Sequence, residues 1–315
     1  IIAGSGDDLI TAGTKGMIDT VTGGSGLDSF TVNAGTSSSP VTVNIIDLGN
    51  GSDSEVLMVG SRATANVTMA GDWIATSVSA NSGAVYITTS TFDVDLSLAS
   101  GSKGYSVTSD SVSGTPVIIT GSAFADTLTG GAGNDVLNGG GGQVSSGILT
   151  VTDLSGTGTA ADVLNISSGA IANATLSGAW TATASTSISG YAELITNGYA
   201  VDVSAAKGEA GFYIANTGVA ASITGSSQAD TLVGGTGNDT LSGGNGNDII
   251  YGGGGIDAIN VGSSSNGLDE VRLTTLDGKT SSPAAGGGTQ ISGLNLTPTV
   301  SDSLHDAVMF EAGTA

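Results

Sequence analysis

Apolar residues recur along this chain at two periods, and neither is the period of a helix. In residues 225–260 a large aliphatic residue returns every nine positions, each time two residues after an aspartate. Elsewhere, as in 41–46 and 85–88, apolar and polar residues alternate over short runs that glycine, asparagine and serine interrupt. Alternation predicts half-buried β-strands, and no 3.6-residue stripe appears. The pattern therefore predicts an all-β chain.

The stretch 225–260 divides into four nonapeptides, which read GSSQADTLV, GGTGNDTLS, GGNGNDIIY and GGGGIDAIN. Three of the four fit G-G-x-G-x-D-x-U-x, where U is a large apolar residue. Glycines permit tight turns with positive φ, and their carbonyl oxygens can then face a cation beside the aspartate carboxylate. The apolar residue at position 8 is expected to point from a short strand into the core. A repeat of this form predicts a parallel β-roll that binds Ca²⁺.

The spacing of the aspartates predicts how they pair. Two nonapeptides make one coil of the roll, and neighbouring coils stack about 4.8 Å apart. One nonapeptide cannot supply the roughly six to eight oxygens that Ca²⁺ prefers. Aspartates that lie two nonapeptides apart are therefore expected to face one another across an ion. The array offers Asp230 with Asp248 on one edge, and Asp239 with Asp257 on the other.

Two further glycine arrays are less regular. Residues 1–31 place Asp8, Asp19 and Asp28 in the frame, with a two-residue insertion between Asp8 and Asp28. Residues 121–143 place aspartates on opposite edges, and the last repeat there lacks its aspartate. A flexible Gly-rich linker is the alternative interpretation, but a linker does not keep an aspartate and an aliphatic residue in phase through four repeats.

The segments between the arrays repeat each other, because Trp73 aligns with Trp180 and Asn66 with Asn173 at the same 107-residue offset. We expect the tryptophans to be packing residues rather than a ligand-stacking platform. A long-period repeat with an array at each joint predicts an elongated, modular molecule in which β-roll arrays alternate with β-rich modules. The predicted parts are an array (1–31), a β-rich module (32–120), a short array (121–143), a β-rich module repeating the first (144–224), an array (225–260) and a partial or divergent third module (261–315).

Charge and composition limit the partners. The chain carries 28 acidic and 6 basic residues, a net charge of -22. Nucleic acid is therefore not an expected partner, whereas multivalent cations suit such an excess of carboxylates. There is no cysteine for disulfides, and no run of about 18 apolar residues that would span a membrane. The chain opens in mid-repeat, which suggests a portion of a longer polypeptide.

The residues needed for common catalytic sites are missing. One histidine, His305, and no cysteine exclude His-rich zinc sites and cysteine nucleophiles. Neither a G-x-S-x-G elbow nor a phosphate loop occurs. Paired carboxylates for glycoside hydrolysis remain open, although each aspartate in frame has a plainer role as a Ca²⁺ ligand. We expect no enzymatic activity from these residues.

The G-G-x-G-x-D arrays resemble those of RTX proteins of Gram-negative bacteria. The resemblance implies export in an unfolded state by type I secretion machinery and folding on Ca²⁺ outside the cell, so that the protein is extracellular or on the cell surface. It also implies which residues bind the ion. The implied carboxylate ligands are Asp8, Asp19, Asp28, Asp126, Asp135, Asp230, Asp239, Asp248 and Asp257, and the glycines of the regular loops are Gly235, Gly237, Gly244, Gly246, Gly253 and Gly255.

Three functions remain from the sequence. Runs such as 188–196 are similar to the Ser-Gly-x-x-x-Leu/Val strands of RTX surface-layer proteins. This favours a Ca²⁺-dependent structural protein that associates with itself in a surface layer or filament. The alternatives are a repeat adhesin that binds glycans or surfaces, and the non-catalytic Ca²⁺-binding part of a secreted RTX enzyme or toxin. The lack of catalytic machinery argues against the last.

Overall fold

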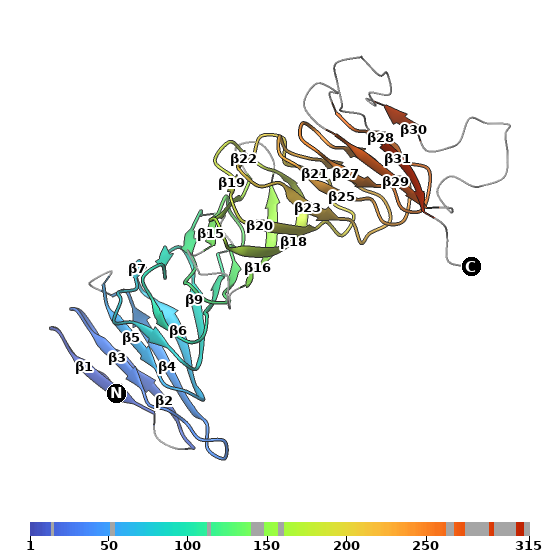
Figure 1. Ribbon diagram of the computed structural model, residues 1–315. Coiled ribbons are helices and arrows are strands. Elements are labelled where there is room, and N and C mark those ends of the chain that lie inside the picture. The colour runs from blue at the N-terminus through green and yellow to red at the C-terminus, as the bar shows by residue number, and fades with distance from the viewer. Residues whose placement is uncertain are drawn as a thin grey trace. The chain divides into compact units, whose positions relative to one another are not determined.

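The computed structural model describes residues 1–13, 16–50, 54–111, 115–139, 148–156, 161–262, 268–274, 290–292 and 307–311. All regular secondary structure in these ranges is β-strand (Figure 1). The strands pair in parallel with strands roughly one coil further along the chain, which is the pairing of a β-solenoid. The predicted all-β, parallel-coil fold class is confirmed. Helices long and apolar enough to cross a membrane are absent from the ranges given above.

The chain forms two compact units. The first comprises residues 1–152 and 162–172, and the second comprises 153–161 and 173–315. The division falls inside the segment 144–224 of the sequence prediction. Most of 261–315, including His305, and the end of the short array at 140–143 lie outside the described residues.

The first unit contains three parallel ladders. One is the five-stranded sheet β1-β3-β5-β8-β11, one runs β2-β4-β6-β9-β12-β14-β16, and one runs β7-β10-β13-β15-β17. The strands are β1 (Leu9–Ala12), β2 (Ile18–Val21), β3 (Ser29–Val32), β4 (Val41–Leu48), β5 (Val56–Val59), β6 (Ala63–Met69), β7 (Trp73–Ile74), β8 (Ala80–Asn81), β9 (Ala84–Thr89), β10 (Val94–Asp95), β11 (Ser100–Gly101), β12 (Ser106–Ser109), β13 (Ile118–Thr120), β14 (Thr127–Thr129), β15 (Val136–Gly139), β16 (Ile148–Gly156, which reaches into the second unit) and β17 (Val163–Ile166).

The second unit contains two long ladders and the pair β19-β22. The ladders run β20-β23-β25-β27-β29-β31 and β18-β21-β24-β26-β28-β30. The strands are β18 (Ile171–Thr181, which begins in the first unit), β19 (Ser187–Ile188), β20 (Tyr191–Ile195), β21 (Val201–Asp202), β22 (Lys207–Gly208), β23 (Phe212–Ala215), β24 (Ser222–Thr224), β25 (Thr231–Val233), β26 (Thr240–Ser242), β27 (Ile249–Tyr251), β28 (Ala258–Asn260), β29 (Glu270–Thr274), β30 (Gln290–Ser292) and β31 (Ala307–Glu311).

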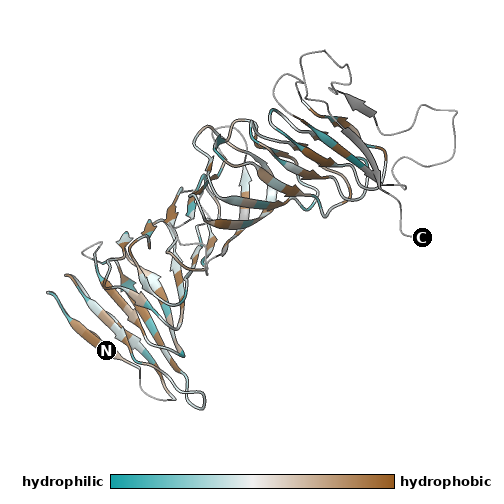
Figure 2. Cartoon of the chain, viewed as in Figure 1, coloured by the Kyte–Doolittle hydropathy of each residue, from teal (hydrophilic) through white to brown (hydrophobic). Residues whose placement is uncertain are grey.

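The nonapeptide period sets the register and the core of the array at 225–260. Leu232 pairs with Ile250, and Leu241 pairs with Ile259, so one coil is two nonapeptides long. These position-8 side chains are fully buried, as the repeat predicts. Figure 2 shows hydrophobic and hydrophilic residues following one another along the short strands. Burying the position-8 side chains stabilises the coil by about 1.5–3 kcal/mol each.

The segments between the arrays also form parallel coils, but with longer turns. Thr42 pairs with Thr64, and the side-chain amide of Asn66 donates to Asn44 Oδ1, 22 residues earlier. The 107-residue offset appears in the pairing as well: Trp73 pairs with Val94, and Trp180 pairs with Val201. The two tryptophans are 0% and 1% exposed, so they are packing residues and cannot form a ligand platform.

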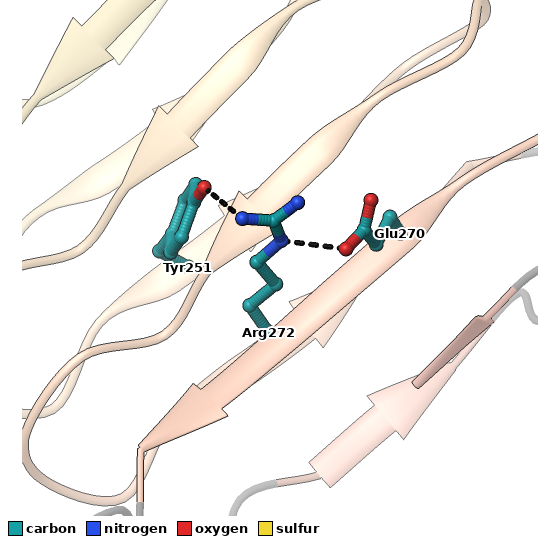
Figure 3. A network of polar contacts seen from close by, with 3 residues as sticks. All are labelled: Tyr251, Glu270 and Arg272. Atoms are coloured by element: carbon teal, nitrogen blue, oxygen red, sulfur yellow. Dashed lines mark hydrogen bonds and ion pairs between the residues drawn. The ribbon is translucent and has the colours of Figure 1, made fainter. Parts of the chain in front are cut away.

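A small polar cluster ties β29 to the last coil of the array. Tyr251 and Arg272 are register partners on β27 and β29. Arg272 donates from Nη1 to the Tyr251 hydroxyl over 2.8 Å and from Nε to Glu270 Oε1 over 2.5 Å (Figure 3). The guanidinium carbon also lies 5.2 Å from the centre of the tyrosine ring. These contacts are partly exposed, so their contribution is about 1 kcal/mol or less.

Candidate calcium sites

The array aspartates are linked by a repeated hydrogen bond. The backbone N–H of Asp230 donates to Asp248 Oδ1, and that of Asp239 donates to Asp257 Oδ1, each over 2.9 Å. All four side chains are buried at the junction of a glycine loop with the following strand. The spacing of two nonapeptides thus does bring these aspartates side by side on adjacent coils.

The first array shows the same bond across its longer coil. The Asp8 N–H donates to Asp28 Oδ1 over 2.9 Å, 20 residues away, so the two-residue insertion is accommodated without losing the pairing. Asp28 is buried and Asp8 is half-buried. Asp19 is also half-buried, and its Oδ2 accepts from Gly13 N–H over 2.9 Å.

The second carboxylate oxygen of several aspartates has no hydrogen-bond donor. Oδ2 of Asp28, Asp239 and Asp248 is buried without a partner. A buried charged oxygen left unpaired is strongly destabilising, and such atoms in a native protein point to a bound ion or a role in chemistry. These oxygens are where a cation would fit.

Backbone carbonyls complete the surroundings of these oxygens. A Cβ built on Gly234 would touch both Asp239 Oδ2, at 2.8 Å, and the carbonyl oxygen of Gly252 in the next coil. A Cβ on Gly243 would likewise touch Asp248 Oδ2 and, at 2.9 Å, the Val261 carbonyl oxygen. A side chain at either glycine would clash with these oxygens, so glycine is what allows a carboxylate oxygen and a carbonyl oxygen of the next coil to converge beside each aspartate.

The glycines at positions 2 and 4 of the regular repeats have the backbone conformation that the sequence predicts. Their φ values are positive and lie between 86° for Gly235 and 132° for Gly255, a range that an L side chain rarely adopts. The six predicted loop glycines all belong to this set, namely Gly235, Gly237, Gly244, Gly246, Gly253 and Gly255.

Burial raises the pKa of buried aspartates in the array, and neighbouring negative charges add to the shift at Asp248. Burial raises the pKa of Asp248 to about 7; the hydrogen bond from Asp230 N–H opposes the shift, and the charges of Asp230 and Asp269 add to it. Burial also raises the pKa of Asp239, against hydrogen bonds from Ala221 and Asn216. Negative groups held together in this way favour a cation between the coils.

Both carboxylate oxygens of two candidate ligands, Asp230 and Asp126, already accept hydrogen bonds. Both Asp230 oxygens accept from the Ser226 hydroxyl, and Asp230 also accepts from the N–H groups of Ser226 and Phe212 over 2.6 Å. Asp126 has the equivalent bonds from Ser122. Serine replaces the second glycine of the repeat at both places. The serine thus satisfies the carboxylate in the way that an ion would.

Three buried acidic residues, Glu55, Asp162 and Asp269, were not predicted as site residues from the sequence. Asp135 donates its N–H to Asp162 Oδ1 over 3.0 Å, and Asp248 donates its N–H to Asp269 Oδ1 over 2.9 Å. Glu55 occupies the matching place after Asp28, because Ser29 pairs with Val56. Their 107-residue offset was the signal that could have found them.

The atoms available to coordinate an ion at these loops indicate which kind of ion fits. In the part of the chain that the structure describes, no three His, Cys, Asp or Glu side chains are grouped to hold a metal. Any ion at these loops is therefore held by one or two carboxylates together with backbone carbonyls. An all-oxygen, flexible set of this kind suits Ca²⁺ and not zinc or copper.

Parallel coils with oxygen-lined glycine loops define a calcium-binding β-solenoid. The family model of the RTX calcium-binding nonapeptide repeat (4 copies) matches residues 118–143 and 224–259. The repeats and the fold together fit an RTX repeat protein. Comparisons with curated proteins and with solved structures gave no match.

Replacing Gly253 tests the loop geometry. Gly253 has φ +92°, and a Cβ there would collide with the Gly235 carbonyl oxygen, whereas a Cβ on Gly254 meets nothing closer than 4.0 Å. We expect Gly253→Ala to destabilise the Ca²⁺-loaded protein by about 2–4 kcal/mol. Gly254→Ala, the matched control, should change stability by about 0.5 kcal/mol or less. Urea unfolding measures both, and equal effects would refute the loop assignment.

Asp239 and Asp230 should differ as ligands. In Asp239→Asn the amide nitrogen replaces the unpartnered oxygen, and we expect the affinity of that ion to fall by about tenfold or more. Asp230→Asn should have a smaller effect, because serine already satisfies the Asp230 carboxylate. Calcium titration of the two variants by calorimetry compares them. A larger loss in Asp230→Asn would show that the serine does not substitute for an ion.

Proposed function

We propose that this protein is an extracellular, Ca²⁺-dependent structural protein, a subunit or segment of a surface layer or filament, without enzymatic activity. The observation that carries the proposal is the return of one coil pattern at the 107-residue offset, with a glycine array before each return. Repeated, rigid modules joined by ion-binding arrays serve a structural role well. Secretion in an unfolded state is consistent with a net charge of -22, which opposes compaction until cations bind.

We infer self-association from the backbone edges of the parallel ladders. Parallel ladders present backbone edges that invite further pairing unless charges or loops cover them. With 6 basic residues in all, the chain has few lysines with which to protect an edge. Acidic loops on neighbouring copies could also share cations.

Electron microscopy and light scattering with Ca²⁺ and after chelation test the structural role. We expect ordered assemblies or filaments with Ca²⁺ that disperse when the ion is removed. Mg²⁺ at the same concentration is the control for general charge screening. Monomeric particles in every condition would contradict the proposal.

A repeat adhesin is the second candidate, and a pair of grooves favours it. A groove of about 460 Å³ includes Gly83, Tyr86 and Tyr105, and one of about 370 Å³ includes Gly190, Tyr191 and Phe212. Gly83 and Gly190, like Tyr105 and Phe212, are related by the 107-residue offset, so the two grooves occupy equivalent places in the repeats. Tyr86 is 53% exposed and Tyr191 is 47% exposed. Exposed aromatic rings with polar surroundings are suited to stacking on sugars.

Glycan-array binding distinguishes the adhesin from the structural protein. If the grooves bind glycans, Tyr86→Ala together with Tyr191→Ala should abolish binding while leaving Ca²⁺ binding unchanged. Val219→Ala, at an 80% exposed residue outside both grooves, is the control. Absence of glycan binding by a monomeric wild-type chain would remove this candidate.

A further inference from the structure

One acidic residue follows each glycine array at the same structural place, outside the residues that match the repeat family. These residues are Glu55, Asp162 and Asp269, and successive members are related by the 107-residue offset. Each directly precedes a strand: β5, β17 and β29. Each strand pairs in parallel with the strand that follows the last array aspartate on the same edge, which is Asp28, Asp135 or Asp248.

The hydrogen bond at the exit of an array is the bond found inside it. Asp248 N–H donates to Asp269 Oδ1 over 2.9 Å, as Asp230 N–H does to Asp248 Oδ1. Asp135 N–H donates to Asp162 Oδ1 over 3.0 Å. The coil at the exit is longer, with 21 residues to Asp269 and 27 to Asp162, yet the carboxylate occupies the same position.

The oxygen of Asp248 that lacks a donor lies beside this exit coil. Asp248 is fully buried and its Oδ2 has no hydrogen-bond partner. The space beside it, over Gly243, is also bordered by the carbonyl oxygen of Val261, which precedes Asp269 in the chain. Carboxylate and carbonyl oxygens from two successive coils thus converge there, as they do beside Asp239 in the interior of the array.

The first array provides an independent case. Asp28 Oδ2 and Glu55 Oε1 are both buried without a partner, and the side chains are 1% exposed. The other Glu55 oxygen, Oε2, accepts from Gly49 N–H over 2.6 Å. Asp47 lies close enough to add its charge to both groups, and its own oxygens accept from Gly23 and Gly24 N–H. Two unpartnered carboxylate oxygens on neighbouring coils require a cation or a proton to be stable in the interior.

We propose that Asp269, Asp162 and Glu55 are closing ligands, each supplying the second carboxylate for a Ca²⁺ ion whose first carboxylate is the last aspartate on the same edge of the preceding array. This inference rests on the Ca²⁺ binding of the arrays and adds an ion site at each exit that the nonapeptide motif does not encode. A closing ligand lets the last aspartate of an edge bind an ion although no further repeat follows it there. It also joins the array to the longer coils behind it, because ion binding holds the two coils together.

Native mass spectrometry of the full chain in Ca²⁺, with calorimetric titration, tests the closing ligands. We expect Asp269→Asn to bind one ion fewer than the wild type, or to bind it about tenfold more weakly. Asn keeps the oxygen that accepts from Asp248 N–H, so the fold is preserved. Asp269→Glu, which retains a carboxylate, should recover the ion. Glu209→Gln, at an exposed residue of the same unit, is the control for the change of charge.

The other arrays provide the second test, and it does not depend on Asp269→Asn folding. Asp162→Asn and Glu55→Gln should each lose one ion, with Asp110→Asn at an exposed residue as their control. If the wild type binds Ca²⁺ and the closing-ligand variants bind as many ions with the same affinity, this inference is wrong. The array sites would remain supported in that case. A wild type that binds no Ca²⁺ would overturn the array sites and the closing ligands together.

Discussion

Removal of Ca²⁺ with EDTA is expected to abolish the cooperative unfolding transition of the glycine arrays and to lower the β-sheet signal in circular dichroism. The buried oxygens of Asp239 and Asp248 lack donors without an ion, and the net charge of -22 acts against compaction. An ion that binds only the folded state stabilises that state by an amount that increases with the logarithm of the free ion concentration. Among single changes of conditions, chelation is expected to cause the largest loss of stability.

The size of the chelation effect should depend on pH. Burial raises the pKa of Asp248 to about 7 and of Asp230 to about 6, above their unfolded values. A raised carboxyl pKa means that the folded state holds the proton more tightly, so this stabilisation is present at low pH and is lost as pH rises through about 4 to 7. The ion-free protein should therefore be less destabilised at pH 5 than at pH 8, so that part of the unfolding transition lost on chelation at pH 8 returns at pH 5.

Melting curves at both pH values, with Ca²⁺ and with EDTA, measure this effect. Adding excess Ca²⁺ back to the chelated sample should restore the transition, which is the control for irreversible damage. Identical melting with and without EDTA at pH 8 would contradict the proposed ion dependence.

Trp73→Ala is expected to destabilise the Ca²⁺-loaded protein by about 3–5 kcal/mol. The indole is fully buried, and its N–H donates to the Glu55 carbonyl oxygen over 2.8 Å. Truncation leaves a cavity between coils and removes the donor from a buried carbonyl. Trp180→Ala should have a similar effect, because Trp180 is as well buried and has the same register.

Urea unfolding in saturating Ca²⁺ measures the tryptophan variants. Tyr86→Ala is the control, since more than half of that side chain is exposed and its loss should change stability by about 0.5 kcal/mol. A tryptophan variant as stable as this control would contradict the packing role. Such a result would also reopen the question of a ligand platform.

The aspartate pairs could be predicted from sequence because one number, the length of a coil, fixes both register and side-chain direction. Asp239 and Asp257 lie side by side for that reason. The role of Ser226 could not be predicted, because it depends on where a hydroxyl can reach once the loop has formed. Asp269 was missed because its coil is 21 residues long and breaks the period.

The intervening segments show a different limit of sequence patterns. Alternation in 41–46 predicts a strand with one buried face, and β4 has that burial pattern. Alternation does not specify the partner strand, because parallel and antiparallel pairs share the two-residue period. The parallel pairing of β4 with β6 includes a register shift between Ile45 and Leu48, and no short motif records it.

Isothermal titration of the full chain with Ca²⁺, after complete removal of bound ions, measures directly whether the arrays bind the ion. We expect saturable binding of several ions, with dissociation constants at or below about 10⁻⁴–10⁻³ M, the range of extracellular calcium modules, accompanied by a gain of β structure. Mg²⁺ should compete poorly, because it favours a smaller octahedral site that retains water. No binding heat and no change in structure up to millimolar Ca²⁺ would show that the arrays are not calcium sites.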